Sequence, residues 1–310
     1  MSATLTVDDP TLLGFAEEVG ETGPVAIVGG QTRWDIGGES AGEPRLLRAP
    51  EGIVDYKPEE MTVKVRAGTT VADLHAALAE KGQWTALPDR GGTVGGALAV
   101  GENDIRALGR GRVRESLLQV RYVSAEGRIV SSGGPTVKNV SGFDLPRLMV
   151  GSLGTLGCLA EVILRTNPIP AVSRWLHADR VDAGTAFDAL LHPSAVLTDG
   201  SGTWVQLEGH RADVDQQASI LQTLGSFTEV DGPPALPEHR WSLSPSEAAA
   251  FPAFDDGLAF VAAVGLGLIF ADAPQPLRPL EAAVALINER MKQNFDPTGR
   301  LNPGRDAGRK

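Results

Sequence analysis

Clustered glycines are the feature that most constrains this sequence. The chain has 310 residues, of which 37 are glycine and 21 are proline, more than a helical bundle would carry. The glycines of its first half stand in close groups, at positions 29–30, 37–38, 91–92, 95–96, 109/111 and 151/154/157. Glycine allows sharp turns and a close approach of a ligand to the main chain. The grouping therefore predicts several bare loops that together bind something.

Composition narrows the class of protein. Apolar residues make up 42% and charged residues 22% of the chain, which is typical of a folded globular protein. The net charge of -11 disfavours a nucleic-acid partner, because phosphate backbones would be repelled. A single cysteine, Cys158, excludes a disulfide framework, a cysteine-rich zinc site and an iron–sulfur cluster. We interpret Cys158 as a packed residue of an apolar strand.

No export or membrane segment is visible in the sequence. Residues 1–10 lack a basic and an apolar region, so they do not form a signal peptide. The most apolar run, 258–271, is shorter than the ~20 residues of a spanning helix and contains Gly265 and Gly267. It is interpreted as a buried strand. The expected location is the cytoplasm, with no transmembrane segment.

Hydrophobic spacing predicts mixed α and β structure. Apolar or alternating runs followed by turn residues predict strands at 24–28, 53–56, 62–66, 118–122, 129–130, 159–165, 203–207 and 258–270. Helical spacing and capping residues predict helices from Thr70 to Gly82, over 185–191 and 213–224, and along the stripe formed by Leu280, Val284, Ile287 and Met291. Glycines become rare after Pro168. We therefore expect an α+β protein in two parts, residues 1–168 and 169–280, with residues 281–310 returning to the first part.

The first glycine loop, Val28-Gly29-Gly30-Gln31-Thr32-Arg33, follows a predicted strand directly. Consecutive backbone N–H groups in such a turn can converge on an anion. An ordinary strand-to-helix turn explains the same residues about equally well. Neither a G-x-G-x-x-G between strand and helix nor a G-x-x-x-x-G-K-[ST] motif is present, which weakens NAD and ATP interpretations.

Two further loops strengthen the binding interpretation. Residues 88–99 carry four glycines followed by small residues, and residues 151–162 carry three more before a strand. A bare backbone lets a long or flat ligand lie against it. Three separated loops suit a dinucleotide better than a small metabolite.

Five motifs in one order resemble a known family. They are Val-Gly-Gly-Gln-Thr at 28–32, Val-Lys-Val-Arg-Ala-Gly-Thr-Thr-Val-Ala-Asp-Leu at 63–74, Gly-Gly-Thr-Val-Gly-Gly at 91–96, Gly-Phe-Asp-Leu-Pro-Arg-Leu at 142–148 and Gly-Ser-Leu-Gly-Thr-Leu-Gly at 151–157. This order is similar to the PCMH-type FAD-binding domain of the vanillyl-alcohol oxidase superfamily. The resemblance implies a two-subdomain FAD-binding domain at 1–168, a small α+β cap or substrate domain at 169–280, and a C-terminal helix and tail at 281–310.

The resemblance also implies which residues bind FAD. The diphosphate loop falls on Gly29, Gly30, Gln31, Thr32 and Arg33, and the segment along the flavin and ribityl chain on Pro88, Gly92, Thr93, Val94, Gly95 and Gly96. The adenosine half falls on Gly109, Gly111, Arg112, Gly157, Leu159 and Val162. Asn302 lies in the tail that closes over the flavin ring in this family, although turn chemistry in Asn302-Pro303-Gly304 is an equal explanation.

Residues 291–305 resemble the tails of FAD-linked 2-hydroxy-acid oxidoreductases. The short middle part, residues 169–280 with Trp241-Ser242-Leu243, is similar to FAD-binding subunits of glycolate oxidases. The implied function is oxidation of a 2-hydroxy acid such as glycolate. The implied partners are a larger flavoprotein subunit and an iron–sulfur subunit, which would place the chain in the cytoplasm or at the periphery of the inner membrane. The alternative is a non-catalytic subunit that holds FAD and relays electrons or acts as a scaffold.

Departures from the family pattern limit the chemistry. The first loop and residues 101–114 contain no histidine or cysteine, so the FAD is expected to be noncovalent. The five histidines, His75, His177, His192, His210 and His239, have no metal-ligand spacing, so no metal site is expected and the catalytic base stays unassigned. A basic run at 106–114 and Lys138 are either ligand contacts or surface residues.

Overall fold

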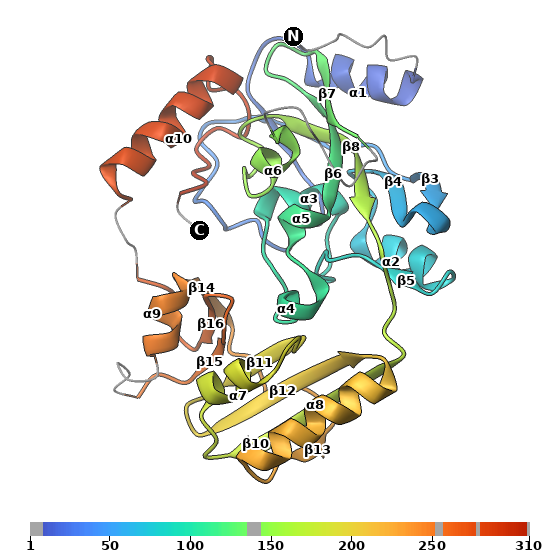
Figure 1. The fold of residues 1–310 in the computed structure, drawn as a ribbon. Coiled ribbons are helices and arrows are strands. Elements are labelled where there is room, and N and C mark those ends of the chain that lie inside the picture. The colour runs from blue at the N-terminus through green and yellow to red at the C-terminus, as the bar shows by residue number, and fades with distance from the viewer. Residues whose placement is uncertain (1–8, 135–143, 252–256, 277–279, 309–310) are drawn as a thin grey trace. The chain divides into compact units, whose positions relative to one another are not determined.

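The computed structural model describes residues 9–134, 144–251, 257–276 and 280–308. The chain divides into two compact units (Figure 1). Unit 1 consists of residues 1–103, 113–168 and 278–310, and unit 2 of residues 104–112 and 169–277. The sequence placed residues 104–112 in the first domain, whereas the structure assigns them to unit 2.

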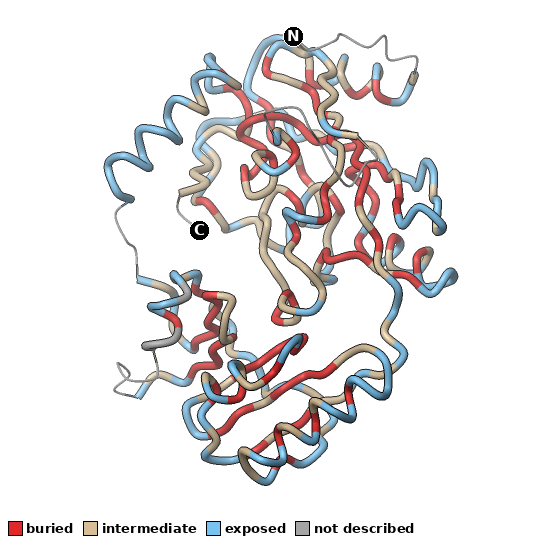
Figure 2. The backbone as a smooth tube through the Cα atoms, in the orientation of Figure 1, coloured by how far each residue is buried: buried red, intermediate tan, exposed pale blue. Residues whose placement is uncertain are grey.

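Unit 1 is built on a five-stranded antiparallel sheet. Its order is β3-β4-β8-β6-β7, formed by Ile53–Lys57, Thr62–Arg66, Cys158–Arg165, Leu117–Val123 and Ile129–Gly133. The central strand β8 is buried from its first residue to its seventh, because β4 and β6 flank it and helices cover it. Val63, Val120 and Leu164 are fully buried in this core, whereas most of the edge strand β3 is exposed (Figure 2).

Smaller strand pairs complete unit 1. β1 (Val25–Ile27) pairs with β2 (Arg45–Leu47) in parallel, and β5 (Gln83–Trp84) pairs with β9 (Asn167–Pro168). The helical elements are α1 (Pro10–Val19), η1 (Pro58–Glu60), α2 (Val71–Ala79), α3 (Val94–Val100), α5 (Val113–Ser116), α6 (Leu145–Met149) and α10 (Ala282–Phe295).

Local sequence explains where the longer helices of unit 1 begin. The α2 helix begins after Thr70, whose hydroxyl accepts from the Asp73 backbone N–H at 3.0 Å, confirming the predicted cap. Val71, Leu74 and Leu78 form its buried stripe. The α1 helix begins in the same way after Asp9, whose carboxylate accepts from the N–H groups of two first-turn residues.

The C-terminal tail is fastened into unit 1. Leu301 forms a parallel bridge with Val25, and the Val25 N–H donates to the Arg300 carbonyl at 2.9 Å. The Arg300 guanidinium is buried and donates to five backbone carbonyls, those of Val19, Gly20, Thr22, Gly23 and Ala125. Burial of so many paired polar groups fixes the position of the tail.

Unit 2 is a seven-stranded antiparallel sheet with helices. The strand order is β13-β10-β12-β11-β15-β16-β14, formed by Thr228–Val230, Val172–Asp179, Gly202–Gly209, Ala195–Thr198, Phe260–Ala263, Leu268–Ala271 and His239–Ser242. Its helices are α4 (Ala107–Arg110), α7 (Ala183–Ala189), α8 (Arg211–Leu224) and α9 (Pro245–Ala250). Val205 and Leu207 of β12 pack with Val214 and Leu221 of α8 in one core cluster.

Packing and charge explain why residues 104–112 belong to unit 2. Ile105 lies in an apolar cluster with β11, β15 and β16. A Cβ on Gly109 would come within 2.9 Å of the Ser194 Cα, so this glycine allows close contact with the start of β11. The Arg110 guanidinium donates to Glu208 of β12, with a 3.0 Å bond from Nε. These long-range contacts are invisible in the local sequence.

Two predicted elements differ from the structure. Residues 258–270 form two strands rather than one, because Gly265 and Gly267 adopt positive φ angles of 78° and 69° and turn β15 back onto β16. The helix α10 forms, but none of its residues is buried. No helix in the described part of the chain is long and apolar enough to cross a membrane.

Candidate cofactor-binding site

The three predicted glycine loops meet around one cavity of unit 1. It is lined by residues from 27–36, 88–102 and 153–159, with Ala49, Ala67, Gly68 and the tail residues Asn302 and Arg305. Its empty space is about 1120 Å³, part of which opens to solvent. Because that figure includes open solvent, the lining residues and not the volume define the site.

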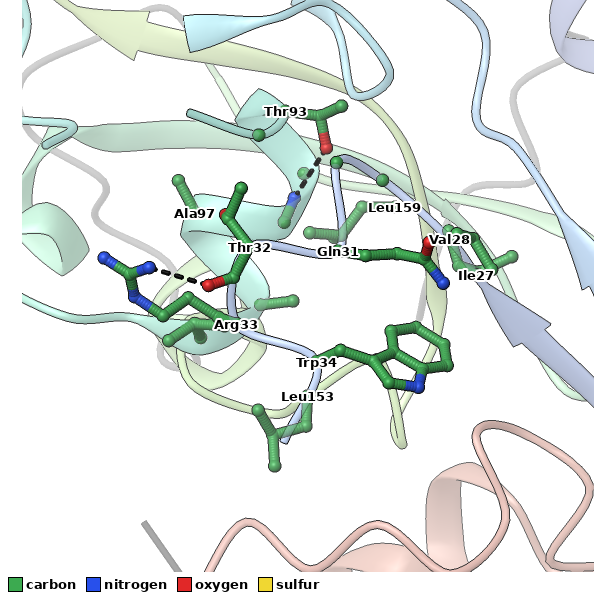
Figure 3. A pocket seen from close by; sticks show the side chains of 18 of the residues that line it. Ile27, Val28, Gln31, Thr32, Arg33, Trp34, Thr93, Ala97, Leu153 and Leu159 are labelled. Atoms are coloured by element: carbon green, nitrogen blue, oxygen red, sulfur yellow. Dashed lines mark hydrogen bonds between the residues drawn. The ribbon is translucent and has the colours of Figure 1, made fainter. Parts of the chain in front are cut away.

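The first loop leaves β1 and supplies unpaired backbone donors. Among the described residues, no acceptor is found for the N–H groups of residues 29–32. Gln31 has a positive φ of 56°, which turns the chain sharply within this run. Adjacent unpaired N–H groups in such a turn form a concave site for an anion. Figure 3 shows Gln31 and Arg33 pointing to opposite sides of this loop.

The second loop packs directly on the first. A Cβ on Gly30 would lie 2.6 Å from the Gly92 Cα, and one on Gly92 would lie 3.0 Å from the Thr32 hydroxyl. Position 30 therefore requires glycine for the two backbones to touch, and the positive φ of 85° at Gly92 favours glycine there. Thr93 then begins α3, because its hydroxyl accepts from the Gly96 N–H at 3.1 Å (Figure 3).

The third loop is joined to the first by the tail. The Asn302 side chain donates to the Leu153 carbonyl at 2.6 Å and accepts from the Ile27 N–H at 3.0 Å. Asn302 thus bridges the end of β1 and the loop at 153, while it lines the cavity. Its φ of 43° is the left-handed conformation that asparagine tolerates. Asn302 therefore serves both as a turn residue and as a hydrogen-bonding bridge between the two loops.

Charged groups of the cavity wall are paired with each other. One Glu102 carboxylate oxygen accepts from Arg33 Nε at 3.1 Å and from an Arg90 terminal nitrogen at 3.3 Å. On the tail, the Arg305 guanidinium lies 4.5 Å from the centre of the Trp34 ring, within the range of a cation–π contact. The second loop and the tail are therefore both held to the first loop by charged side chains.

Most of the residues implied by the resemblance line this one cavity. They are Gly29, Gly30, Gln31, Thr32, Arg33, Pro88, Gly92, Thr93, Gly95, Gly96, Gly157, Leu159 and Asn302. Val94 and Val162 do not line it, because both side chains are buried in the core of unit 1. Gly109, Gly111 and Arg112 belong to unit 2, and their contact with the cofactor stays a prediction. Lys138, Gly142 and Phe143 lie outside the described residues.

Several lining residues were not singled out by the sequence. Trp34, Arg90, Glu102, Leu153 and Arg305 line the cavity as well. Position offers a partial indication for Trp34 and Arg90, since each adjoins a glycine loop. No local sequence pattern predicted that Glu102 and Arg305 line the cavity, because only the tertiary structure brings these residues to it.

The remaining candidates have ordinary surroundings. Within the described residues, no group of three or more histidine, cysteine or acidic side chains could hold a metal ion. His177 stacks on Trp204 with ring centres 4.2 Å apart, and His239 lies in β14. Burial raises the pKa of the Cys158 thiol to about 12, so Cys158 is a protonated residue of the core.

The cavity fits FAD on two independent grounds. Its unpaired N–H groups and its three arginines suit a diphosphate, whereas the apolar walls that include Ile27, Ala49 and Leu159 suit ring systems. A side chain at Gly30 would clash with the Gly92 backbone, so glycine at this position lets the first two loops meet at the cavity wall.

Family comparison agrees with the geometry. Residues 16–133 match the family described as FAD binding domain. The order of the glycine motifs predicted this PCMH-type FAD-binding domain in the first part of the chain, and FAD is its cofactor. The chain is an FAD-linked oxidoreductase.

Similarity to glycolate oxidase subunit GlcE of Escherichia coli (strain K12) extends over nearly the whole chain. The two are 29% identical over 330 residues, covering 93% of this chain and 94% of GlcE. Glycolate oxidase subunit GlcD of Bacillus subtilis (strain 168) is 34% identical, covering 44% of this chain and 30% of GlcD. D-lactate dehydrogenase of Archaeoglobus fulgidus is 33% identical, covering 51% of this chain and 36% of that protein.

Solved structures support the fold alone. Alkyldihydroxyacetonephosphate synthase matches with a TM-score of 0.65 at 14% identity, covering 94% of this chain and 73% of that one. Phl p 4, a grass pollen allergen with glucose dehydrogenase activity, matches with a TM-score of 0.52 at 16% identity, covering 71% of this chain and 50% of the allergen. The α+β fold with a PCMH-type FAD-binding part is thereby confirmed.

Proposed function

We propose that this chain is the FAD-binding subunit of a complex that oxidises a 2-hydroxy acid such as glycolate. The observation that supports it is the single cavity in which all three glycine loops and Asn302 meet. The end-to-end similarity to GlcE, whose name states that it is a subunit of glycolate oxidase, supports the substrate class. The GlcD similarity supports a larger flavoprotein as partner. An iron–sulfur subunit and attachment to the inner membrane through partners stay predictions.

The chain's own residues would position the cofactor. In our proposal, the N–H groups of residues 29–32 donate to the diphosphate, and Asn302 holds the tail against the loop at 153. Bound FAD supplies the hydride acceptor for oxidation of the alcohol carbon. The first loop offers no cysteine or histidine for a covalent link, so the cofactor is proposed to be dissociable.

A second candidate function is a non-catalytic subunit that holds FAD and relays electrons. One observation favours it. The titratable side chains lining the cavity are Arg33, Arg90, Glu102 and Arg305, all within the described residues, and the only carboxylate is paired with two guanidiniums. A general base for alcohol oxidation needs a free proton-accepting atom within reach of the substrate, and this wall does not supply one.

Anaerobic reduction separates the two candidates. The purified, FAD-loaded chain is mixed with glycolate or D-lactate, and the visible absorption of the flavin is followed. Bleaching by the chain alone supports turnover of the substrate. Bleaching only after a GlcD-like subunit is added supports the relay. A purified chain that binds no FAD refutes both.

A further inference from the structure

The C-terminal end of α10 carries a lysine and an aspartate that contact each other. Lys292 lies in the last turn of the helix, and Asp296 follows it as the C-terminal cap. The Lys292 Nζ donates to Asp296 Oδ2 at 2.6 Å. Residues 282–290 of α10 are exposed (Figure 2), whereas the Asp296 side chain is 0% exposed. We call these two residues the Lys292–Asp296 pair, and they lie at the buried end of the helix.

The ammonium of Lys292 joins three segments of unit 1. Besides Asp296, it donates to the Thr155 carbonyl at 2.9 Å and to the Leu301 carbonyl at 3.1 Å. Thr155 belongs to the third glycine loop, and Leu301 belongs to the tail. A lysine ammonium has three donors, and all three have an acceptor here. Lys292 therefore connects α10, the third loop and the tail through a single atom.

The carboxylate of Asp296 shapes the turn that leads from α10 into the tail. Its Oδ2 also accepts from the Leu301 N–H at 2.8 Å. Its Oδ1 accepts from the Arg300 N–H at 3.0 Å and from the Thr298 hydroxyl at 3.3 Å. A buried carboxylate is stable only when it is paired and hydrogen-bonded, and these contacts meet that requirement. The path of residues 296–301 is thus set around one side chain.

The contacts of Lys292 lie next to those of Asn302 in both segments. Leu301 directly precedes Asn302, which lines the cavity. Thr155 lies two positions after Leu153, whose carbonyl accepts from the Asn302 side chain at 2.6 Å. The same two segments are therefore joined twice, once by Lys292 and once by Asn302 at the cavity wall.

The pair differs from an ordinary ion pair on a helix. A surface pair four residues apart joins residues of one helix and is screened by solvent. Here the carboxylate is buried, and both members also bind the tail. The tail lies close against the third loop, because a Cβ on Gly154 would overlap the Asn302 side-chain nitrogen. Lys292 and Asp296 do not line the cavity themselves, so a change at either reaches the cavity only through these two segments.

With FAD placed in this cavity as in the proposed function, on which this inference rests, we propose that Lys292 and Asp296 are positioning residues of the cofactor site. They hold the tail and the third glycine loop in the arrangement that Asn302 bridges at the cavity wall. The cofactor site thereby extends to the end of α10, which has no contact with the cavity of its own.

The test titrates the cofactor-free full chain with FAD and follows flavin fluorescence. Lys292→Met keeps the length of the side chain and removes its three donors. It should weaken FAD binding roughly three- to tenfold, the scale of one lost hydrogen bond. The matched control is Lys57→Met, because Lys57 is also a lysine of unit 1 paired with a carboxylate, that of Glu60 at 3.5 Å, and does not line the cavity. The control should leave FAD affinity unchanged.

A double-mutant cycle shows whether the pair acts through Asn302. Asn302→Ala removes the side-chain hydrogen bonds to Ile27 and Leu153. If Lys292 works by holding these segments in place, adding Lys292→Met to Asn302→Ala should weaken FAD binding little further. Lys292→Arg keeps the positive charge and should restore part of the affinity lost in Lys292→Met. A purely structural role would lower the temperature of unfolding and leave the FAD affinity of the folded variants unchanged.

Each result decides the proposal. Unchanged FAD affinity in a folded Lys292→Met overturns it, and so do losses that add independently in the double variant with Asn302→Ala. An equal loss in Lys57→Met would mean a general effect of charge, and an affinity of Lys292→Arg no higher than that of Lys292→Met would exclude a role for the charge; either overturns the proposal. If Lys292→Met does not fold, Lys292→Gln takes its place, and a loss of affinity that depends on Asn302 is still required. A wild type that binds no FAD refutes the proposed function itself, whereas binding that is insensitive to Lys292 refutes only the positioning role.

Discussion

Replacement of Gly30 by alanine tests the contact that creates the cavity. The added methyl carbon would lie 2.6 Å from the Gly92 Cα and 3.1 Å from the Gly92 nitrogen. Carbon atoms attract best at about 3.5–4.0 Å, so the two loops must separate by roughly 1 Å at this point. Neither neighbour is a flexible side chain, and the strain therefore falls on the backbone.

The magnitude follows from two costs. Overpacking against a fixed neighbour costs about 1–3 kcal/mol of folding stability. Displacing the first loop also misdirects the N–H groups of residues 29–32. A hydrogen bond to a charged group is worth about 1.5–3 kcal/mol, and the loss of one such bond weakens binding roughly ten- to 150-fold. Gly30→Asp should be more severe, because it adds a negative charge where the diphosphate is proposed to lie.

The assay compares FAD affinity and thermal unfolding with a matched glycine. Gly14 lies in α1 and has no atom within 4 Å of an added Cβ. Gly14→Ala should leave FAD affinity unchanged and raise stability by about 0.5–1 kcal/mol, as expected for a helical glycine. A Gly30→Ala protein that retains a full complement of FAD with wild-type affinity would refute the proposed diphosphate site.

Three further predictions concern the tail, the core and unit 2. Asn302→Ala removes two side-chain hydrogen bonds that join the first and third loops. This substitution should lower the free energy of unfolding by about 1–3 kcal/mol and weaken FAD binding. The control Asn294→Ala, at an exposed position of α10, should change neither quantity. Cys158, whose pKa burial raises to about 12, should resist thiol reagents at neutral pH and react only after unfolding; labelling at the same rate in both states would contradict its placement. Burial acts to raise the pKa of Glu208, but the Arg110 contact outweighs it and lowers that pKa. Glu208 therefore adds stability above its unfolded-state pKa, and this stability is lost as the pH falls through the lower folded-state pKa. Acid unfolding monitored at several pH values should show this loss in the wild type and not in Glu208→Gln.

Local sequence patterns correctly predicted several elements of unit 1. The strand over residues 62–66 matches β4 to the residue, and the Thr70 cap lies where α2 begins. Period-2 alternation and capping act over a few neighbouring residues, so they can be recognised in a linear sequence. The glycine loops were recognisable for the same reason, since each loop is defined by its own backbone requirements.

Long-range pairing accounts for what the sequence missed. Glu102 becomes part of the cavity wall only because Arg33 and Arg90 approach it from two other segments. The assignment of residues 104–112 to unit 2 depends on distant partners. Ser194 lies 85 positions after Gly109, and Glu208 lies 98 positions after Arg110. Such contacts join segments that are far apart in the chain, and the local sequence of one segment does not indicate which other segment it will contact.

The sequence by itself indicated the bare loops, because they depend on residue types at short spacing, and the resemblance of five ordered motifs implied an FAD-binding domain. The tertiary structure alone decided that the three loops share one cavity, that Asn302 joins two of them by hydrogen bonds, and that one carboxylate pairs with two arginines at the wall. Those outcomes require segments up to 275 positions apart to meet. Their meeting is set by burial and hydrogen bonding across the whole of unit 1.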